Sequence, residues 1–134
     1  EPNQVHYTAN VERGIDTSGI LTMDYTGFKA VSMAAKDCAA PARCIIQGTK
    51  GYIQQKSTAN CCGGITFHPN EGKEEHYNLN GGRPREAAEF ETFARAMESG
   101  DQELCTRMQD TSIAVSRVLT VARRSAGIRF PGER

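Results

Sequence analysis

Apolar and polar residues alternate along the first two thirds of this 134-residue chain, and helical spacing replaces that alternation in the last third. In residues 18–25 nearly every second residue is apolar, which is typical of a strand with one buried face. Thr26-Gly27 follows as a two-residue turn, because glycine supplies the positive φ that a tight hairpin needs. Residues 28–36 then return as the partner strand.

Other short segments also have strand composition, and glycine, proline or asparagine separates most of them. The expected strands cover residues 5–9, 43–47, 52–54, 65–67 and 74–79. Pro41 lies in a loop between the third and fourth of the seven strands, at residues 37–42. Strands that precede helices in separate runs indicate an α+β fold instead of alternating βαβ units.

The last third predicts two helices, at residues 84–99 and 101–126. Pro84 suits a first helical turn, Gly100 suits the end of the first helix, and Asp101 suits the cap of the second. The first helix has an apolar stripe with i, i+3, i+4, i+7 spacing, formed by Phe90, Phe93, Ala94 and Met97. The second is expected to bury Leu104, Met108, Val115, Val118, Leu119 and Ala122.

These elements predict a single domain over residues 1–134. We expect an open-faced, mostly antiparallel β-sheet with the two C-terminal helices packed on one face. The length and the 38% content of hydrophobic residues suffice for one modest core. The two helices leave the other face of such a sheet uncovered, so we expect another protein surface to cover it.

Charge and hydropathy narrow the class of partner. Lys plus Arg is 16 and Asp plus Glu is 16, so the formal net charge is zero and gives no electrostatic reason to expect nucleic acid or an anionic membrane. No apolar run approaches the roughly 20 residues that span a bilayer. The polar start, Glu1-Pro2-Asn3-Gln4, lacks the pattern of a signal peptide.

The five cysteines, an odd number without the spacing of a small disulfide-rich domain, favour a reducing, cytoplasmic compartment. The adjacent Cys61 and Cys62 are expected to be free thiols on opposite faces of a strand. No Cys-x2-4-Cys pair occurs and the three histidines are scattered, so we expect no metal site. The stretch at residues 60–64 has no functional interpretation.

Motifs for catalysis are weak. Gly48-Thr49-Lys50-Gly51 lacks the Gly-x-Gly-x-x-Gly of a Rossmann turn and the helix that follows a P-loop, so a structural turn is expected. A spatial assembly of Cys62, His68 and a carboxylate stays open as a nucleophilic site. Glu74 and Glu75 should point to opposite faces of a strand and act as solvated surface.

Five segments in this order resemble the C-terminal domain of the glucose–fructose oxidoreductase/inositol dehydrogenase/MocA family of NAD(P)-dependent oxidoreductases. They are residues 1–5 (Glu-Pro-Asn-Gln-Val), residues 19–30 around Thr26-Gly27, residues 46–53 (Ile-Gln-Gly-Thr-Lys-Gly-Tyr-Ile), residues 89–93 (Glu-Phe-x-x-Phe), and residues 122–131 (Ala-Arg-Arg-Ser-Ala-Gly-Ile-Arg-Phe-Pro). The resemblance covers most of the chain, from about residue 5 to residue 131.

The resemblance implies that an N-terminal Rossmann domain of the same protein binds NAD(P) and supplies the catalytic lysine and histidine. The family's Glu-Lys-Pro and Asp-x3-His motifs lie upstream of the matched segment, so no catalytic, cofactor-binding or metal-binding residue is carried over. His6 is not that histidine, because it lies on the strand that follows it. The resemblance further implies a sugar, polyol or related small-molecule substrate, and contact with a second subunit through the open sheet face.

Met23, Tyr25, Val31 and Met33 are the expected residues of that subunit contact, since a sizeable exposed apolar patch usually marks an interface. Two other functions are kept open: a stand-alone ligand-binding or scaffold module with the same fold, and a small enzyme that uses Cys62 or His68. The substrate, the choice between NAD and NADP, and the oligomer size do not follow from the sequence.

Overall fold

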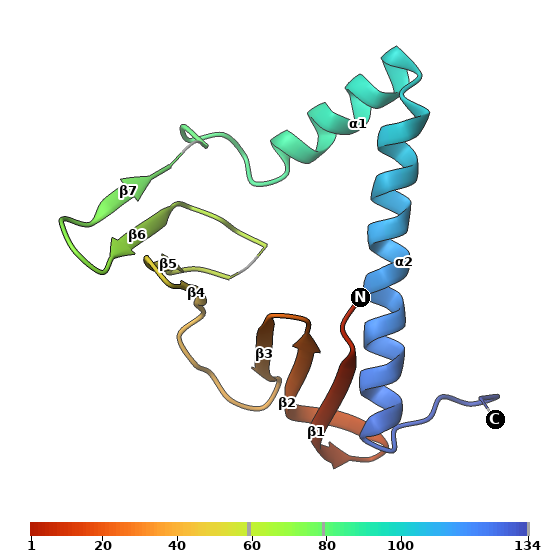
Figure 1. Ribbon diagram of the computed structural model, residues 1–134. Helices are drawn as coiled ribbons and strands as arrows, with labels where there is room; N and C mark the ends of the chain where they lie inside the picture. Colours follow the sequence, from red (N-terminus) through yellow and green to blue (C-terminus); the bar gives the residue numbers. More distant parts are fainter. Residues whose placement is uncertain (59, 79, 134) are drawn as a thin grey trace. The chain divides into compact units, whose positions relative to one another are not determined.

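The computed structural model describes residues 1–58, 60–78 and 80–133 (Figure 1). The chain divides into two compact units. Unit 1 comprises Glu1–Ala39 and Asp101–Arg134, and unit 2 comprises Ala40–Gly100. No helix among the described residues is long and apolar enough to cross a membrane.

Unit 1 contains a three-stranded antiparallel sheet. Its strands are β1 (Gln4–Glu12), β2 (Ile15–Tyr25) and β3 (Phe28–Ala35), in the order β1-β2-β3. Tyr25 pairs with Phe28 across the turn, and Gly27 has φ 91°, so the predicted two-residue hairpin is confirmed. The two aromatic rings stack at 4.4 Å between centroids.

The register divides this sheet into an inner and an outer face. Leu21 pairs with Tyr7 on one side and Ser32 on the other, and residues directly opposite one another in an antiparallel pair share a face. These three belong to the inner face, toward the second helix. Ile20 pairs with Met33 on the outer face, where both side chains are exposed.

Helix α2 (Gln102–Ser125) packs on β1 within unit 1 (Figure 1). Asp101 caps it as predicted, because its Oδ1 accepts a hydrogen bond of 2.9 Å from the Leu104 amide. At the other end, Ser125 Oγ accepts one of 2.9 Å from the Tyr7 amide. Since β1 is an edge strand, this hydroxyl satisfies a backbone donor that no neighbouring strand reaches.

The buried side of α2 differs in part from the prediction. Ala122 is 5% exposed, as expected for a core position, but Val115 and Leu119 are exposed. Ala114 is half-buried in place of Val115. The contact partner of α2 in unit 1 is the edge strand β1, which covers a narrower stripe of the helix than a broad sheet would.

Unit 2 contains a four-stranded antiparallel sheet of consecutive strands. They are β4 (Cys44–Gly48), β5 (Gly51–Gln55), β6 (Ile65–Pro69) and β7 (Glu75–Tyr77), in that order. The last strand was predicted to reach residue 79, but it ends at Tyr77, and Leu79 lies outside the described residues.

Helix α1 (Ala87–Ser99) follows in unit 2 and begins three residues later than predicted. Pro84 precedes the helix: its carbonyl accepts from the Ala87 amide at 3.1 Å in a turn. Gly100, with φ 66°, ends the helix as predicted. The predicted stripe exists as a pattern, but Phe90 and Met97 are exposed, so unit 2 does not bury it.

The α+β class, with antiparallel strands and C-terminal helices, is confirmed. The strands form two sheets of three and four strands, where one sheet was expected. Residues 36–43, which contain Pro41, carry no strand, and the first three strands close on each other through local hairpins. The prediction of a single domain over residues 1–134 stays a prediction.

Candidate functional site

A cavity of about 550 Å³ lies within unit 1, between the inner face of the three-stranded sheet and α2. Its walls are mostly apolar, and a few polar groups converge on it, which is the usual composition of a ligand site. Its lining comprises Tyr7, Asp16, Gly19, Leu21, Ser32, Ala34, Ser116, Leu119, Thr120, Ala122, Arg123, Ile128 and Phe130.

Tyr7 reaches the cavity by lying over a glycine of the neighbouring strand. A Cβ built on Gly19 would lie 2.3 Å from the Tyr7 ring, which is far inside van der Waals contact. The absence of a side chain at Gly19 therefore lets the ring cross β2. The ring position in turn brings the phenol oxygen 2.9 Å from Asp16 Oδ2.

Asp16 is the centre of a polar cluster at the cavity. It accepts hydrogen bonds from the Tyr7 hydroxyl at 2.9 Å and from Lys36 Nζ at 3.1 Å. The Tyr7 hydrogen bond, followed by that of Lys36, lowers the pKa of Asp16 below its ordinary value. Burial and the same carboxylate raise the pKa of Tyr7. The phenol therefore stays protonated as a donor, and the carboxylate stays charged.

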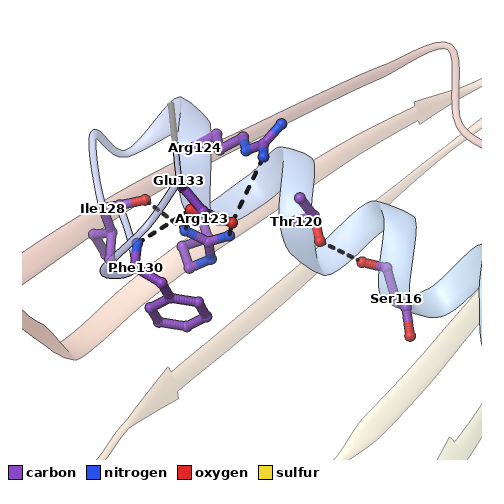
Figure 2. A network of polar contacts seen from close by, with 7 residues as sticks. All are labelled: Ser116, Thr120, Arg123, Arg124, Ile128, Phe130 and Glu133. Carbon is purple, nitrogen blue, oxygen red and sulfur yellow. Dashed lines mark hydrogen bonds and ion pairs between the residues drawn. The ribbon is translucent and has the colours of Figure 1, made fainter.

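The second polar cluster lies at the end of α2 (Figure 2). Both terminal nitrogens of Arg123 donate to the Glu133 carboxylate, with 2.6 Å between Nη1 and Oε2. Arg124 Nη2 lies 3.6 Å from the same carboxylate. The Arg123 and Glu133 side chains are only 15% and 22% exposed. The hydrogen bonds from Arg123 and then from the Phe130 amide lower the pKa of Glu133 to about 2.

The residues after α2 fold back onto Arg123. Its guanidinium donates to the Ile128 carbonyl at 2.9 Å and lies 3.9 Å from the centre of the Phe130 ring. The Phe130 amide donates to Glu133 Oε2 at 3.1 Å, and the Glu133 amide donates to the Phe130 carbonyl at 3.1 Å. One arginine thus holds a short turn that presents a carboxylate and an aromatic ring beside the cavity.

The sheet of unit 2 carries a partly buried histidine, His68, which contacts a tyrosine and a glutamate. His68 stacks on Tyr52, the residue opposite it in register, with 4.3 Å between ring centroids. His68 Nδ1 lies 2.8 Å from Glu74 Oε1, so a carboxylate orients the ring. The side chain is 14% exposed, and its Nε2 is buried without a hydrogen-bond partner in the described part of the chain.

The structure brings His68 together with a carboxylate, and it does not place Cys62 beside them. Cys62 lies three residues before β6, whereas His68 lies near the far end of that strand. At about 3.3 Å per residue, Ile65 and His68 alone are roughly 10 Å apart. Cys62 is exposed, and its carbonyl accepts from the Asn80 side chain. Glu75 binds the Tyr77 hydroxyl instead of forming a pair with Glu74.

A second hollow of about 440 Å³ lies at the β5–β6–β7 end of the same unit. Its lining includes Lys56, Gly63, Gly64, Thr66 and His76. The Thr66 hydroxyl and His76 Nδ1 lie 3.0 Å apart as a cross-strand pair. These polar groups hydrogen-bond within the sheet, and no carboxylate faces them among the described lining residues.

Gly48-Thr49-Lys50-Gly51 is a structural turn, as predicted. Gly48 pairs with Gly51, so the segment joins β4 and β5 as a two-residue hairpin. The Thr49 and Lys50 carbonyls accept from the side chain and backbone of Asn70 at 2.9 and 3.1 Å. The turn is thereby tied to the chain that follows β6.

The four residues expected at a subunit contact do not share one face of the sheet. Met23 pairs with Ala30, which places it on the inner face with Tyr25, while Val31 pairs with Thr22 on the outer face with Met33. In this hairpin, odd-numbered residues of β2 lie opposite even-numbered residues of β3, so Met23 and Val31 face opposite sides of the sheet. Met33 is 71% exposed and Val31 is exposed as well. A role in subunit contact stays a prediction.

All five cysteines lie in the described part of the chain, and there each has a free thiol. Among the described residues, no group of three or more His, Cys, Asp or Glu side chains is arranged to hold a metal ion. Arg123 and Arg124, at the end of α2, instead bring two guanidinium groups to one carboxylate, that of Glu133.

Neither the protein-family models nor the curated proteins contain a match to this chain.

Sequence reasoning missed the cavity residues Tyr7, Asp16 and Arg123 as a site. In the sequence, Arg123 belongs only to the segment at residues 122–131 that carries the family resemblance. A usable signal was present: a pair of arginines ends the helix, and Glu133 follows ten residues after Arg123. Gly19 inside a strand pattern was a second signal, since such a glycine often marks a close approach.

Proposed function

We propose that residues 1–134 are the C-terminal substrate and oligomerisation domain of an NAD(P)-dependent oxidoreductase that acts on a sugar, polyol or related hydroxyl compound. In the parent enzyme, hydride passes between the carbinol carbon and the nicotinamide, and the hydroxyl proton passes to a base. Both the cofactor and that base belong to the N-terminal Rossmann domain. This chain shapes the substrate pocket and catalyses no reaction alone.

The observation that carries the proposal is the order of the elements. Antiparallel strands precede two C-terminal helices, as the resemblance implies, and the β1–β3 sheet has one face toward α2 and one open face. Free thiols at all five cysteines, each in the described residues, support a cytoplasmic parent.

The test is the size of the native protein in its own cells, by immunoblot with an antibody to this domain. A nucleotide-binding domain adds roughly 100–200 residues, so the proposal expects a band well above that of a 134-residue chain. Assays of NAD and NADP reduction then use that parent. A band at the size of 134 residues would overturn the oxidoreductase proposal.

The outer face of the β1–β3 sheet is the proposed homo-oligomer contact. Ile20, Val31 and Met33 are exposed on it, and no described segment of unit 1 covers them. Met33→Asp should weaken self-association in sedimentation equilibrium. Met97→Asp, the same change at an exposed site on α1, is the matched control and should leave association unchanged. Equal weakening by both variants would contradict this assignment.

The alternative is a stand-alone ligand-binding module. The 550 Å³ cavity favours it, because all of its lining belongs to unit 1 and needs no second domain. A native protein of 134 residues that binds a small molecule would support this alternative. Activity of the isolated chain that is lost on Cys62→Ala would instead support a small cysteine enzyme.

A further inference from the structure

At one end of the cavity in unit 1 lies a cationic side chain, Arg123, which is paired with a carboxylate of the same chain. Arg123 both lines the cavity and pairs through its two terminal nitrogens with Glu133. The planar guanidinium fork matches a carboxylate in this two-point geometry. The Arg123 side chain is 15% exposed, so the pair is largely screened from water.

The charge balance at this point favours an anion. Arg123 and Arg124 both approach the single carboxylate of Glu133 (Figure 2). Two cations against one anion leave the cluster positive. Arg123 has two contacts besides Glu133, because it donates to the Ile128 carbonyl and lies over the Phe130 ring. The guanidinium is therefore oriented for a carboxylate whether or not Glu133 supplies it.

The rest of the cavity suits an apolar body. Leu21, Leu119, Ile128 and Phe130 contribute apolar side chains to its lining. Its volume of about 550 Å³ falls within the roughly 300–1,000 Å³ typical of small-molecule sites. Burial of each CH₂ group of a ligand against such walls is favourable.

We propose that this cavity binds a small monocarboxylate with an apolar body, whose carboxylate takes the place of the Glu133 carboxylate on Arg123. This proposal does not depend on the oxidoreductase proposal, because the same cavity is present whether the chain is a domain of an oxidoreductase or a stand-alone module. The orientation of the ligand follows from the other polar cluster. Asp16 is anionic and already paired with Tyr7 and Lys36, so the acid group turns away from it toward Arg123.

The Glu133 side chain acts in this arrangement as an internal competitor. A ligand binds only when Arg123 is free, so its apparent affinity falls by the fraction of time that Glu133 leaves the arginine open. If that fraction is about one tenth, removal of the competitor raises the affinity about tenfold. Glu133→Gln keeps the size of the side chain and removes its charge.

The test is titration of the chain with hexanoate and with the neutral, equally long hexan-1-ol, followed by amide chemical shifts in NMR. The proposal expects saturable shifts with hexanoate in β2 and the end of α2, and at least tenfold weaker binding of hexan-1-ol. Glu133→Gln should tighten hexanoate binding about tenfold, and Arg123→Gln should abolish the preference for the acid.

A second variant covers the case in which Arg123→Gln fails to fold. Ser32→Phe adds an aromatic ring at an exposed residue of β3 that lines the cavity, and it should exclude the ligand body while the arginine pair stays intact. Equal affinity for hexanoate and hexan-1-ol would overturn the proposal. Unchanged hexanoate affinity in Glu133→Gln, or undiminished binding in Ser32→Phe, would overturn it as well.

Discussion

Each of the two sheets contains a glycine that another group approaches closely. This group is a side chain in one sheet and backbone in the other. In the β1–β3 sheet, Gly19 makes room for the side-chain ring of Tyr7. In the β4–β7 sheet, Gly51 makes room for backbone: a Cβ there would lie 2.2 Å from the His68 carbonyl oxygen. A side chain can rotate away from an obstacle, whereas a paired strand cannot, so the two glycines tolerate substitution differently.

The same difference separates the polar clusters of the two units. Tyr7 and Arg123 both line the cavity, and each pairs through its side chain with one carboxylate of the chain, that of Asp16 or that of Glu133. The His68 ring is fixed between Tyr52 and Glu74 on the sheet, and its Nε2 is buried without a partner in the described structure. The first arrangement suits exchange of ligands, and the second suits a rigid sheet.

Gly51→Ala should have the largest effect. Its φ of 142° is unfavourable for alanine, and the new Cβ would collide with the backbone of β6. We expect a loss of about 3 kcal/mol in the free energy of unfolding, measured by urea denaturation. Trimming of a neighbouring side chain, as in His68→Ala, should not rescue the variant. A loss below about 1 kcal/mol would contradict the comparison.

Gly19→Ala should have the next largest effect, about 2 kcal/mol, because the Cβ meets the Tyr7 ring. This loss should be recoverable. In a Tyr7→Leu background the obstacle is gone, so the added cost of Gly19→Ala should fall by at least 1 kcal/mol in a double-mutant cycle. Additive costs would show that the two residues do not meet.

His68→Phe should change the stability little or raise it slightly. Phenylalanine keeps a ring to stack on Tyr52 and removes the unpartnered buried nitrogen. The bond lost to Glu74 costs little, since that carboxylate is exposed. His68→Ala is the control and should cost about 2 kcal/mol, since it also removes the stack. Equal losses in both variants would assign a structural role to the imidazole nitrogens.

The smallest expected effect is the pH dependence of the stability that Glu133 contributes. The pKa of Glu133 is lowered to about 2, so its pairing stabilises the folded chain above the unfolded pKa, 4.5, and that contribution is lost as pH falls toward 2. Glu133→Gln should therefore lower the urea midpoint at pH 7 and differ little from the wild type near pH 2. In an Arg123→Gln background the same change should have little effect at either pH, and an unchanged difference would exclude the pairing.

Most of the secondary structure could be predicted from residues that are close together in the sequence. Thr26-Gly27 and the Gly48–Gly51 turn were predictable because a two-residue hairpin needs particular backbone angles, and Asp101 and Gly100 were predictable because helix ends need caps. The start of α1 was misplaced because proline is compatible with both a first helical turn and the turn before it. The site was not predictable, since the packing of α2 on the β1–β3 sheet brings Arg123 to the same cavity as Tyr7 and Asp16, which lie far from it in sequence.

The sequence by itself determined the α+β class, the order of the elements and the alternation of faces within each strand, because these depend on residues near one another along the chain. The tertiary structure alone decided which faces meet. It divided the strands between two sheets and joined a strand tyrosine to the cavity that the α2 arginine lines. The physical reason is that this packing depends on contacts between residues far apart in sequence, whereas the faces of Met23 and Val31 follow from the two-residue turn that fixes the hairpin register.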